Sequence, residues 1–200
     1  MKRIIYLISP DKISKNFFND LDKVLSVKNV KFFQLRLKKK RLTSIIKISS
    51  KIKKIKKKYK VKFLINDDPF LALKVKADGC HLGQRDMNIN KARTIIGNKI
   101  IGITCHNSIK LAKIAIKNQP NYLAFGAFYS TNTKKVKHKA STKILNEVKK
   151  LTKIPTVAIG GINSRNYKNL LLNNADFLAI SGFIWNNKKN KPLEAIKKLK

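Results

Sequence analysis

Three polar side chains stand at alternate positions where a strongly apolar run of the sequence ends. Residues 30–37 read VKFFQLRL, and extended geometry places Gln34, Arg36 and Lys38 on one side of that strand. In a closed barrel this side faces the mouth of the lumen. An amide followed by two cations is suited to hold an anion such as a phosphate group. The alternative is that the strand has ended and that these side chains, Lys38 above all, are only solvated.

Two of the ten acidic residues follow neighbouring apolar runs. Asp67 comes directly after Asn66 at the end of the third run, and Asp86 follows the fourth run within a few residues. Carboxylates from adjacent strands hold Mg²⁺ through oxygen, and water and substrate phosphate complete its coordination shell. The sequence therefore predicts a magnesium site at Asp67 and Asp86. The alternative is that Asp67 only starts a helix and that Asp86 caps the one beginning near Asn88.

The later runs end in small or hydroxyl-bearing residues. The fifth ends at 104–106 with Thr-Cys-His, where a lone His106 is more often a structural hydrogen-bonding residue than a catalyst. The sixth leads into Ser-Thr-Asn-Thr-Lys at 130–134, which suits phosphate oxygens but also an ordinary turn. The seventh and eighth end in Gly-Gly at 160–161 and Ser-Gly at 181–182. Small residues there let backbone N–H groups approach a phosphate closely.

These strand ends together offer a cation cluster, a candidate Mg²⁺ site, a hydroxyl loop and a second phosphate site. No Ser–His–Asp set and no zinc-type spacing is recognisable. The set of groups fits two phosphorylated substrates. It fits a reaction in which charge has to be stabilised better than one that needs a protein base.

Eight short apolar runs supply the strands that have to position these groups. They are RIIYLIS, VKFFQLRL, KFLIND, GCHLG, KIIGITC, YLAFGAF, TVAIGG and FLAISGF. Strands alternating with helices predict an α/β fold, a (β/α)8 TIM barrel over residues 1–200 as a single domain. The alternative is a doubly wound open sheet, but the Gly-rich fingerprint expected after its first strand is missing, and SPDKIS stands there instead.

The segments between the runs have helical spacing. The clearest has an apolar stripe of Ile45, Ile48, Ile52, Ile55 and Tyr59, with eight lysines between positions 47 and 60. We expect the stripe to face the sheet and the lysines to face water. The dipeptide Asp68-Pro69 is typical of a helix N-cap followed by proline at the first helical position.

The charge balance is unusual, because 46 basic and 10 acidic residues give a net charge of +36. Such a surface attracts nucleic acid, anionic lipid or phosphorylated small molecules. Only six of the basic residues are Arg, and the Lys residues are spread along the whole chain, which favours exposed helix positions filled with Lys. Cys80 and Cys105 lie in apolar runs, which indicates that they are buried free thiols in a reducing compartment. The first apolar run is too short for a signal peptide, so we expect a cytoplasmic enzyme without a membrane span.

Five segments resemble, in order, the signature segments of the thiamine phosphate synthase family. They are QLRLK, FLINDDPFLALKVKADGCHLGQRD, IIGITCH, YLAFGAFYSTNTKK and IPTVAIGGI. The resemblance runs from the second strand to the eighth and covers most of the chain. Its most specific pieces are the ND…HLGQRD pair and the TNTK loop.

The resemblance implies a barrel transferase that joins hydroxymethylpyrimidine pyrophosphate to a thiazole phosphate and releases pyrophosphate, with Mg²⁺ as cofactor. Its implied metal ligands are Asp67 and Asp86, and its implied catalytic cations are Arg36, Lys38 and Lys134. The implied substrate contacts are Gln34, Arg36, Lys38, Asn66, Thr104, Thr131, Thr133, Lys134, Gly161, Ser181 and Gly182. The family reaction is dissociative: pyrophosphate leaves first, and the thiazole nitrogen then captures the pyrimidine-methyl cation.

Two departures from the family pattern and two rival functions stand beside this interpretation. Ser130 replaces a usual Pro, and ISGFIW replaces the common VVSAI at the eighth strand end, where Ser181 and Gly182 are the two candidates for the role of the family's Ser. A thiazole tautomerase shares the barrel, but that branch tends to lose the second Asp and the TxTK loop. A nucleic-acid-binding protein needs clustered Arg and exposed aromatics, which an even spread of Lys does not supply. The sequence does not indicate an oligomeric state.

Overall fold

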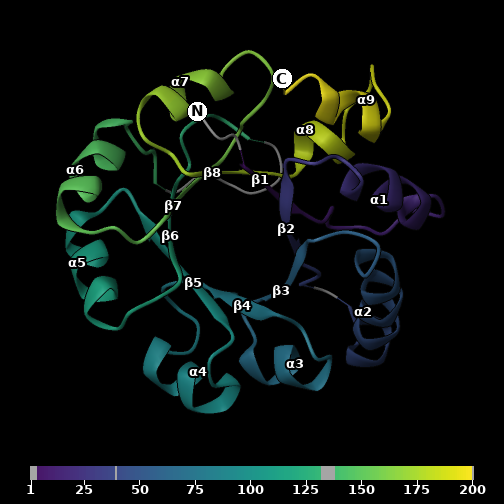
Figure 1. The fold of residues 1–200 in the computed structure, drawn as a ribbon, viewed down its shortest axis with the longest axis horizontal. Coiled ribbons are helices and arrows are strands. Elements are labelled where there is room, and N and C mark those ends of the chain that lie inside the picture. Colours follow the sequence, from purple (N-terminus) through teal and green to yellow (C-terminus); the bar gives the residue numbers. More distant parts are fainter. Residues whose placement is uncertain (1–3, 39, 132–137, 200) are drawn as a thin grey trace.

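The structure is a computed structural model that describes residues 4–38, 40–131 and 138–199. Eight parallel strands pair in sequence order and close into a barrel, and helices surround it (Figure 1). The strands are β1 (Ile4–Ile8), β2 (Val30–Leu35), β3 (Lys62–Asn66), β4 (Gly79–Leu82), β5 (Ile100–His106), β6 (Tyr122–Gly126), β7 (Thr156–Ile159) and β8 (Phe177–Ile180). The predicted (β/α)8 barrel is therefore confirmed.

The helices form a ring outside the strands. They are α1 (Phe17–Leu25), α2 (Leu42–Lys56), α3 (Pro69–Lys74), α4 (Ile89–Ile96), α5 (Ile109–Lys117), α6 (Lys143–Leu151), α7 (Tyr167–Leu172), α8 (Gly182–Trp185) and α9 (Pro192–Lys197). The expected strand FLAISGF was too long: β8 stops at Ile180, and Gly182 starts the short helix α8.

The outer core lies between strands and helices. On α2, Ile52 is fully buried, and the rest of its apolar stripe packs against the same core, as the spacing predicted. At the start of α3, Asp68 Oδ1 accepts the N–H of Leu71, and Pro69 takes the first helical position. This confirms the expected cap.

The lumen is filled by the inward-pointing residues of alternate strand positions. Its buried cluster contains Tyr6, Ile8, Leu64, Tyr122, Ala124, Val157 and Ala179. The rings of Tyr6 and Tyr122 meet edge to face at 5.6 Å between centroids. Gly102 makes room for this pair, because a Cβ on it would lie 1.8 Å from the Tyr122 ring. The lumen is thus a packed core rather than a pore.

Three strand entries share one hydrogen-bonding arrangement at the amino-terminal end of the barrel. In each, a side-chain oxygen just before β4, β6 or β8 accepts a backbone N–H at the start of the preceding strand. The bonds join Phe63 N to Asp78 Oδ2 (2.6 Å), Ile101 N to Asn121 Oδ1 (2.8 Å) and Thr156 N to Asp176 Oδ2 (2.7 Å). This shared geometry explains why KADG, QPNY and NADF look alike in the sequence.

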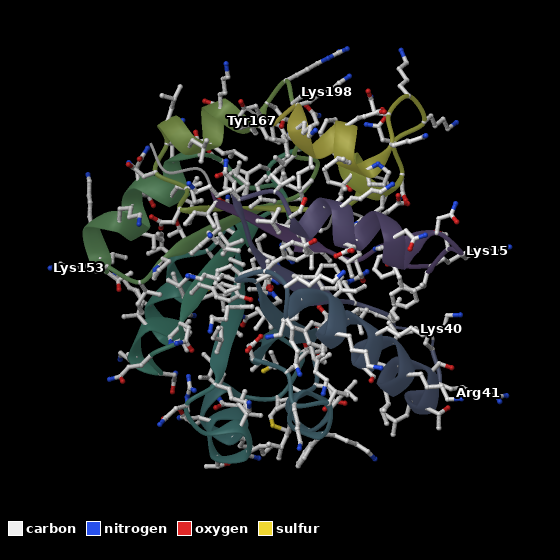
Figure 2. All side chains as sticks on the ribbon, turned by 45° about the vertical axis from the view of Figure 1, so that its right-hand side comes forward. Lys15, Lys40, Arg41, Lys153, Tyr167 and Lys198 are labelled. Carbon is white, nitrogen blue, oxygen red and sulfur yellow. The ribbon has the colours of Figure 1, made fainter. Side chains whose placement is uncertain are left out.

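The charged side chains are distributed around the barrel rather than gathered in one place. Figure 2 shows Lys153 on one side of the molecule, Lys15 and Lys40 on the opposite side, and Lys198 near the top of the view. The lysines of α2 are not all solvated, because Lys56 Nζ lies 2.5 Å from Asp78 Oδ2, which corrects the expectation of a uniformly wet face.

Neither cysteine forms a disulfide. Cys80 and Cys105 are buried free thiols, and burial raises the pKa of each thiol to about 12. Both are therefore poor nucleophiles at neutral pH. Among the described residues, no helix is both long enough and apolar enough to cross a membrane.

Candidate active site

Three predicted substrate-binding residues, Gln34, Arg36 and Lys38, lie at the carboxyl end of β2. Gln34 is inside β2 and 2% exposed, whereas Arg36 and Lys38 follow the strand's last residue, Leu35. Gln34 Nε2 donates a hydrogen bond to the Tyr6 hydroxyl in the lumen. The alternative that these three side chains are only solvated is therefore wrong for Gln34.

Arg36 is fixed by the loop that follows β1. Its backbone N–H donates to Ser9 Oγ (2.9 Å), and its Nη1 lies 2.7 Å from Asp11 Oδ1. The Arg36 side chain is 18% exposed and that of Asp11 is 55% exposed. Sequence reasoning missed Ser9 and Asp11 as the residues that hold this guanidinium. Their only signal was their place in the SPDK segment after the first strand.

Asp67 and Asp86 come together at the ends of β3 and β4. Burial raises the pKa of the Asp86 carboxyl, the N–H of Gly83 lowers it, and the neighbouring Asp67 raises it again. Gly83 N donates to Asp86 Oδ2 at 2.6 Å, which fixes that carboxylate. Lys38 Nζ lies 3.0 Å from Asp67 Oδ2. The structure thus brings the two predicted metal ligands and one predicted cation into one cluster.

The helix-capping alternative for these two acids is wrong. The N-cap of α3 is Asp68, and the N-cap of α4 is Asn88. Asp67 instead adopts a left-handed backbone conformation, with φ of 67°, as its N–H donates to His81 O. A non-glycine residue held in that region often marks a functional position.

These residues fit a divalent cation of the magnesium type. Two close carboxylates without a backbone or cationic partner on every oxygen are the usual protein contribution to a Mg²⁺ site, which keeps several waters. Within the described residues, no group of three or more His, Cys, Asp or Glu side chains is arranged to hold a metal. A site built from two carboxylates and substrate oxygens is therefore the arrangement that this end of the barrel supports.

A line of hydrogen bonds crosses the lumen beneath this cluster. Gln34 Nε2 bonds Tyr6 Oη (3.1 Å), Tyr6 Oη bonds Tyr122 Oη (2.7 Å), and Tyr122 Oη bonds His81 Nδ1 (2.9 Å). The line ends where His81 Nε2 bonds Thr104 Oγ1 (2.8 Å). Two predicted contacts, Gln34 and Thr104, are thus its ends. The three residues between them were missed, although their inward strand positions were readable from the alternation.

The groups in this line are uncharged at neutral pH. Burial lowers the pKa of His81 to about 4, although the Asp67 carboxylate nearby raises it. Burial also raises the pKa of Tyr6 and of Tyr122 well above the ordinary tyrosine value. The lumen therefore supplies neutral donors and acceptors.

The ends of β6 and β7 pack against one another around a glycine pair. Gly160 O accepts the N–H of Tyr129, and Gly161 has a φ of 63°. A Cβ on Gly161 would lie 2.3 Å from the Ser130 carbonyl oxygen. Asn166 Nδ2 donates to Gly161 O (3.0 Å), which leaves the Gly161 carbonyl engaged on the protein side. Gly161 is thus required for this loop packing as well as for the predicted phosphate approach.

The eighth strand end closes onto the first. Ser181 Oγ donates to Ser9 O (3.1 Å), and Trp185 Nε1 donates to Ile8 O (2.7 Å). Ser181 thereby connects to the loop that holds Arg36, while Gly182 begins α8 beside it. Both predicted residues lie at the carboxyl end of the barrel.

The remaining predicted contacts are placed in part. Asn66 is the last residue of β3, and its register partner is His81 on β4. Thr131 lies just beyond the end of β6, whereas Thr133 and Lys134 lie outside the described residues. The ring of His106 lies 4.3 Å from that of His138, centroid to centroid.

Comparison with known proteins assigns the chain to a family. The family model described as thiamine monophosphate synthase matches residues 5–184. The chain belongs to the thiamine monophosphate synthase family. The expected family and the expected enzyme, a transferase that makes thiamine phosphate, are confirmed.

Relatives support the same assignment over the whole chain. A thiamine-phosphate synthase of Pelagibacter ubique is 64% identical over 200 residues, covering 100% of this chain and 97% of the relative. One from Rhodospirillum centenum is 37% identical over 92% of this chain and 89% of its own. Among solved structures, thiamine phosphate pyrophosphorylase from Pyrococcus furiosus aligns with a TM-score of 0.87 and 27% identity, covering 99% of this chain and 94% of that one.

Proposed function

We propose that this chain couples 4-amino-2-methyl-5-hydroxymethylpyrimidine pyrophosphate with a thiazole phosphate, giving thiamine phosphate and pyrophosphate, with Mg²⁺ as cofactor. The observation that carries the proposal is the cluster of Asp67, Asp86 and Lys38, with Arg36 on the adjacent strand end. This is a site for a pyrophosphate and its counter-charges. The presence of Asp86 beside Asp67 supports the synthase over the tautomerase.

The first step of the proposed reaction breaks a carbon–oxygen bond. The bond between the pyrimidine methylene and the pyrophosphate oxygen breaks, and its electron pair leaves with pyrophosphate. Arg36 and Lys38 bring preorganised positive charge to the leaving oxygens, where it stabilises the transition state more than the bound substrate. A Mg²⁺ ion bound at Asp67 and Asp86 would neutralise part of the same developing charge.

The second step forms a carbon–nitrogen bond. The lone pair of the thiazole nitrogen attacks the pyrimidine methylene and gives the thiazolium of thiamine phosphate. No proton has to move to a protein base, which agrees with a site rich in cations and neutral hydroxyls. The chain's part is to orient the two rings and to exclude water from the cation.

The second phosphate site is proposed at the ends of β7 and β8. Gly161, Ser181 and Gly182 lie there, and the small residues leave backbone groups accessible. We assign the thiazole phosphate to this end. Thr131, Thr133 and Lys134 are proposed as further substrate contacts, as the family resemblance implies. A cytoplasmic location belongs to the same proposal, supported by the two buried free thiols.

A coupled assay tests the function. The purified protein is incubated with both substrates, with Mg²⁺ or with EDTA, and thiamine phosphate is quantified by its thiochrome fluorescence. We expect thiamine phosphate and pyrophosphate in equal amounts, and only with the metal. Isomerisation of the thiazole substrate without coupling would contradict the proposal in favour of the tautomerase. Tight DNA binding at physiological salt in a filter assay would favour the nucleic-acid alternative instead.

A further inference from the structure

Each hydrogen bond in the line across the lumen has a direction, because each group has a fixed number of hydrogens. The Gln34 Nε2 group can only donate, so the Tyr6 hydroxyl accepts from it, and Tyr122 Oη is then the acceptor that the described residues offer to the single hydrogen of Tyr6. The Tyr122 hydroxyl, which has accepted, gives its own hydrogen to Nδ1 of His81. The orientation of one amide therefore sets the direction of every link.

The state of His81 follows from these bonds. A neutral imidazole that accepts at Nδ1 carries its hydrogen on Nε2, and this hydrogen is donated to Thr104 Oγ1. Both of these bonds go to hydroxyl groups rather than to a carboxylate. An imidazolium in the lumen would thus lack a charged hydrogen-bonding partner.

The two ends of the line have opposite hydrogen-bonding roles, one as an acceptor and the other as a donor. At one end, the Gln34 amide donates one of its two Nε2 hydrogens to Tyr6, and this orientation leaves its carbonyl Oε1 as an acceptor on the other side of the amide. At the other end, Thr104 Oγ1 accepts from His81 and keeps its own hydrogen as a donor. If the amide were turned over, every link would reverse, and Gln34 would become the donor and Thr104 the acceptor.

We propose that this line of hydrogen bonds selects the pyrimidine by fixing an acceptor at Gln34 and a donor at Thr104. The positioning residues are Tyr6, Tyr122 and His81, which connect the acceptor at Gln34 to the donor at Thr104 through hydrogen bonds. None of the three needs to touch the substrate to do so, since their effect is carried by the direction of the bonds. The line passes through β2, β1, β6, β4 and β5, so it couples five strands around one lumen.

The chemistry of an aminopyrimidine matches these roles, and this step rests on the proposed function. In the 4-amino-2-methylpyrimidine ring, the C4 amino group donates, and N1, directly across the ring from C4, accepts. Gln34 and Thr104 belong to β2 and β5, which the closed barrel separates by β3 and β4. An acceptor on one side and a donor on the other suit such a ring. A 4-oxo analogue presents an acceptor to Gln34 and should be rejected.

The tautomer of His81 tests the proposal directly. In protein labelled with ¹⁵N-histidine, we expect His81 in the Nε2–H form, identified against a His81→Gln variant because the chain has three histidines. The substitution Gln34→Glu should reverse the direction of every hydrogen bond in the line, because an ionised carboxylate can only accept. At a pH where the ¹³C shift of the introduced carboxyl group shows it ionised, we expect the Nδ1–H form of His81.

Several outcomes would overturn the proposal. An Nδ1–H tautomer in the unmodified protein would contradict the assigned direction. An unchanged tautomer in Gln34→Glu with the carboxylate ionised would disprove the coupling. If the carboxyl stays protonated, it donates as the amide does, and loss of the Nε2–H form would then contradict the proposal.

Kinetics provide a second, independent measurement. Tyr122→Phe interrupts the line, and we expect KM for the pyrimidine pyrophosphate to rise about tenfold while KM for the thiazole phosphate stays within about twofold. Tyr59→Phe is the matched control, because its hydroxyl bonds Asp22 on the outer face, and it should change neither constant. Equal rises in both constants for Tyr122→Phe would indicate a merely structural role and sink the proposal. If no thiamine phosphate forms at all, the proposed function fails, while the histidine measurement still tests the line.

Discussion

The two ends of the barrel use the same acidic residue type in opposite ways. At the amino-terminal end, Asp176 Oδ2 accepts hydrogen bonds from Thr156 N and Oγ1 and from the ammonium of Lys149. At the carboxyl-terminal end, Asp67 and Asp86 lie beside one another, and the charge on Asp67 disfavours a charge on Asp86. A carboxylate that is surrounded by hydrogen-bond donors and an ammonium group, as Asp176 is, stabilises the fold. Two neighbouring carboxylates repel each other and lower the stability of the fold, and a bound cation would relieve that repulsion.

The largest effect is expected at the paired acids. Asp86→Asn should lower turnover by more than about a hundredfold, because it removes charge facing the leaving pyrophosphate. Its thermal stability should hold or increase slightly, because like-charge repulsion with Asp67 is removed. A Mg²⁺ titration of the rate and a melting curve measure the two effects. Asp20→Asn, on the outer helix α1, is the control, and near-normal turnover in Asp86→Asn would refute the metal site.

A comparable loss is expected from the guanidinium at the same end. Arg36→Ala should reduce turnover on the order of a hundredfold, chiefly in kcat, since its charge acts on the leaving group in the transition state. Asp11→Asn should have a smaller effect, because it loosens the guanidinium without removing it. Steady-state kinetics with both substrates separate the two variants. A larger loss for Asp11→Asn than for Arg36→Ala would show that the roles are misassigned.

The lumen histidine should make stability depend on pH. The pKa of His81 is lowered from 6.5 to about 4, so the unfolded chain binds more protons than the folded one between these values. The stabilisation is complete above pH 6.5 and is lost as the pH falls towards 4, by up to about 3 kcal/mol. Urea unfolding at several pH values, compared with His81→Gln, isolates this contribution. Parallel pH profiles for the two proteins would contradict the assignment.

At the amino-terminal end the effects should appear in stability and not in turnover. Asp176→Ala leaves the Thr156 N–H without its acceptor and should cost about 1–3 kcal/mol of unfolding free energy. Asp176→Asn should cost less, because Asn121 performs the same task for Ile101. Denaturant unfolding and kcat per folded molecule measure both. A steep loss of kcat in folded Asp176→Ala would break the contrast between the two ends.

The smallest effect is expected on the outer rim. Lys47, Lys54 and Lys57 are exposed on or just after α2, and changing all three to Gln should leave turnover within about twofold, since screening limits their reach. Lys56 is excluded from this set because it pairs with Asp78. The salt dependence of kcat/KM compares the triple variant with Arg36→Ala. Equal losses in the two would mean that bulk positive potential, and not a positioned cation, serves the reaction.

Local patterns in the sequence predicted the eight strands, the buried face of α2 and the placement of the described candidate residues at one end of the barrel. Period-two alternation predicted that Gln34 points inward, and the three-and-four spacing on α2 predicted which of its residues are buried. The Asp-Pro pair predicted a helix start at Asp68. Strand ends were also predictable to within a few residues, so residues from distant segments could be assigned to one barrel mouth. The predicted eighth strand was too long, because the apolar sequence ISGFIW is compatible with a strand and also with a short helix.

The partners of these residues were decided only by the tertiary structure. Tyr6 and Tyr122 are 116 positions apart, and their hydroxyls meet only because the barrel closes with a particular stagger of its strands. Pairing of neighbouring strands brings Lys38 to Asp67 and Arg36 to Asp11, and closure of β8 onto β1 brings Ser181 to Ser9. Periodicity reports which way a side chain points but carries no information on what stands opposite it. The residue types at the site were therefore readable from the sequence, whereas their pairing, their charge states and the direction of the bonds between them required the closed barrel.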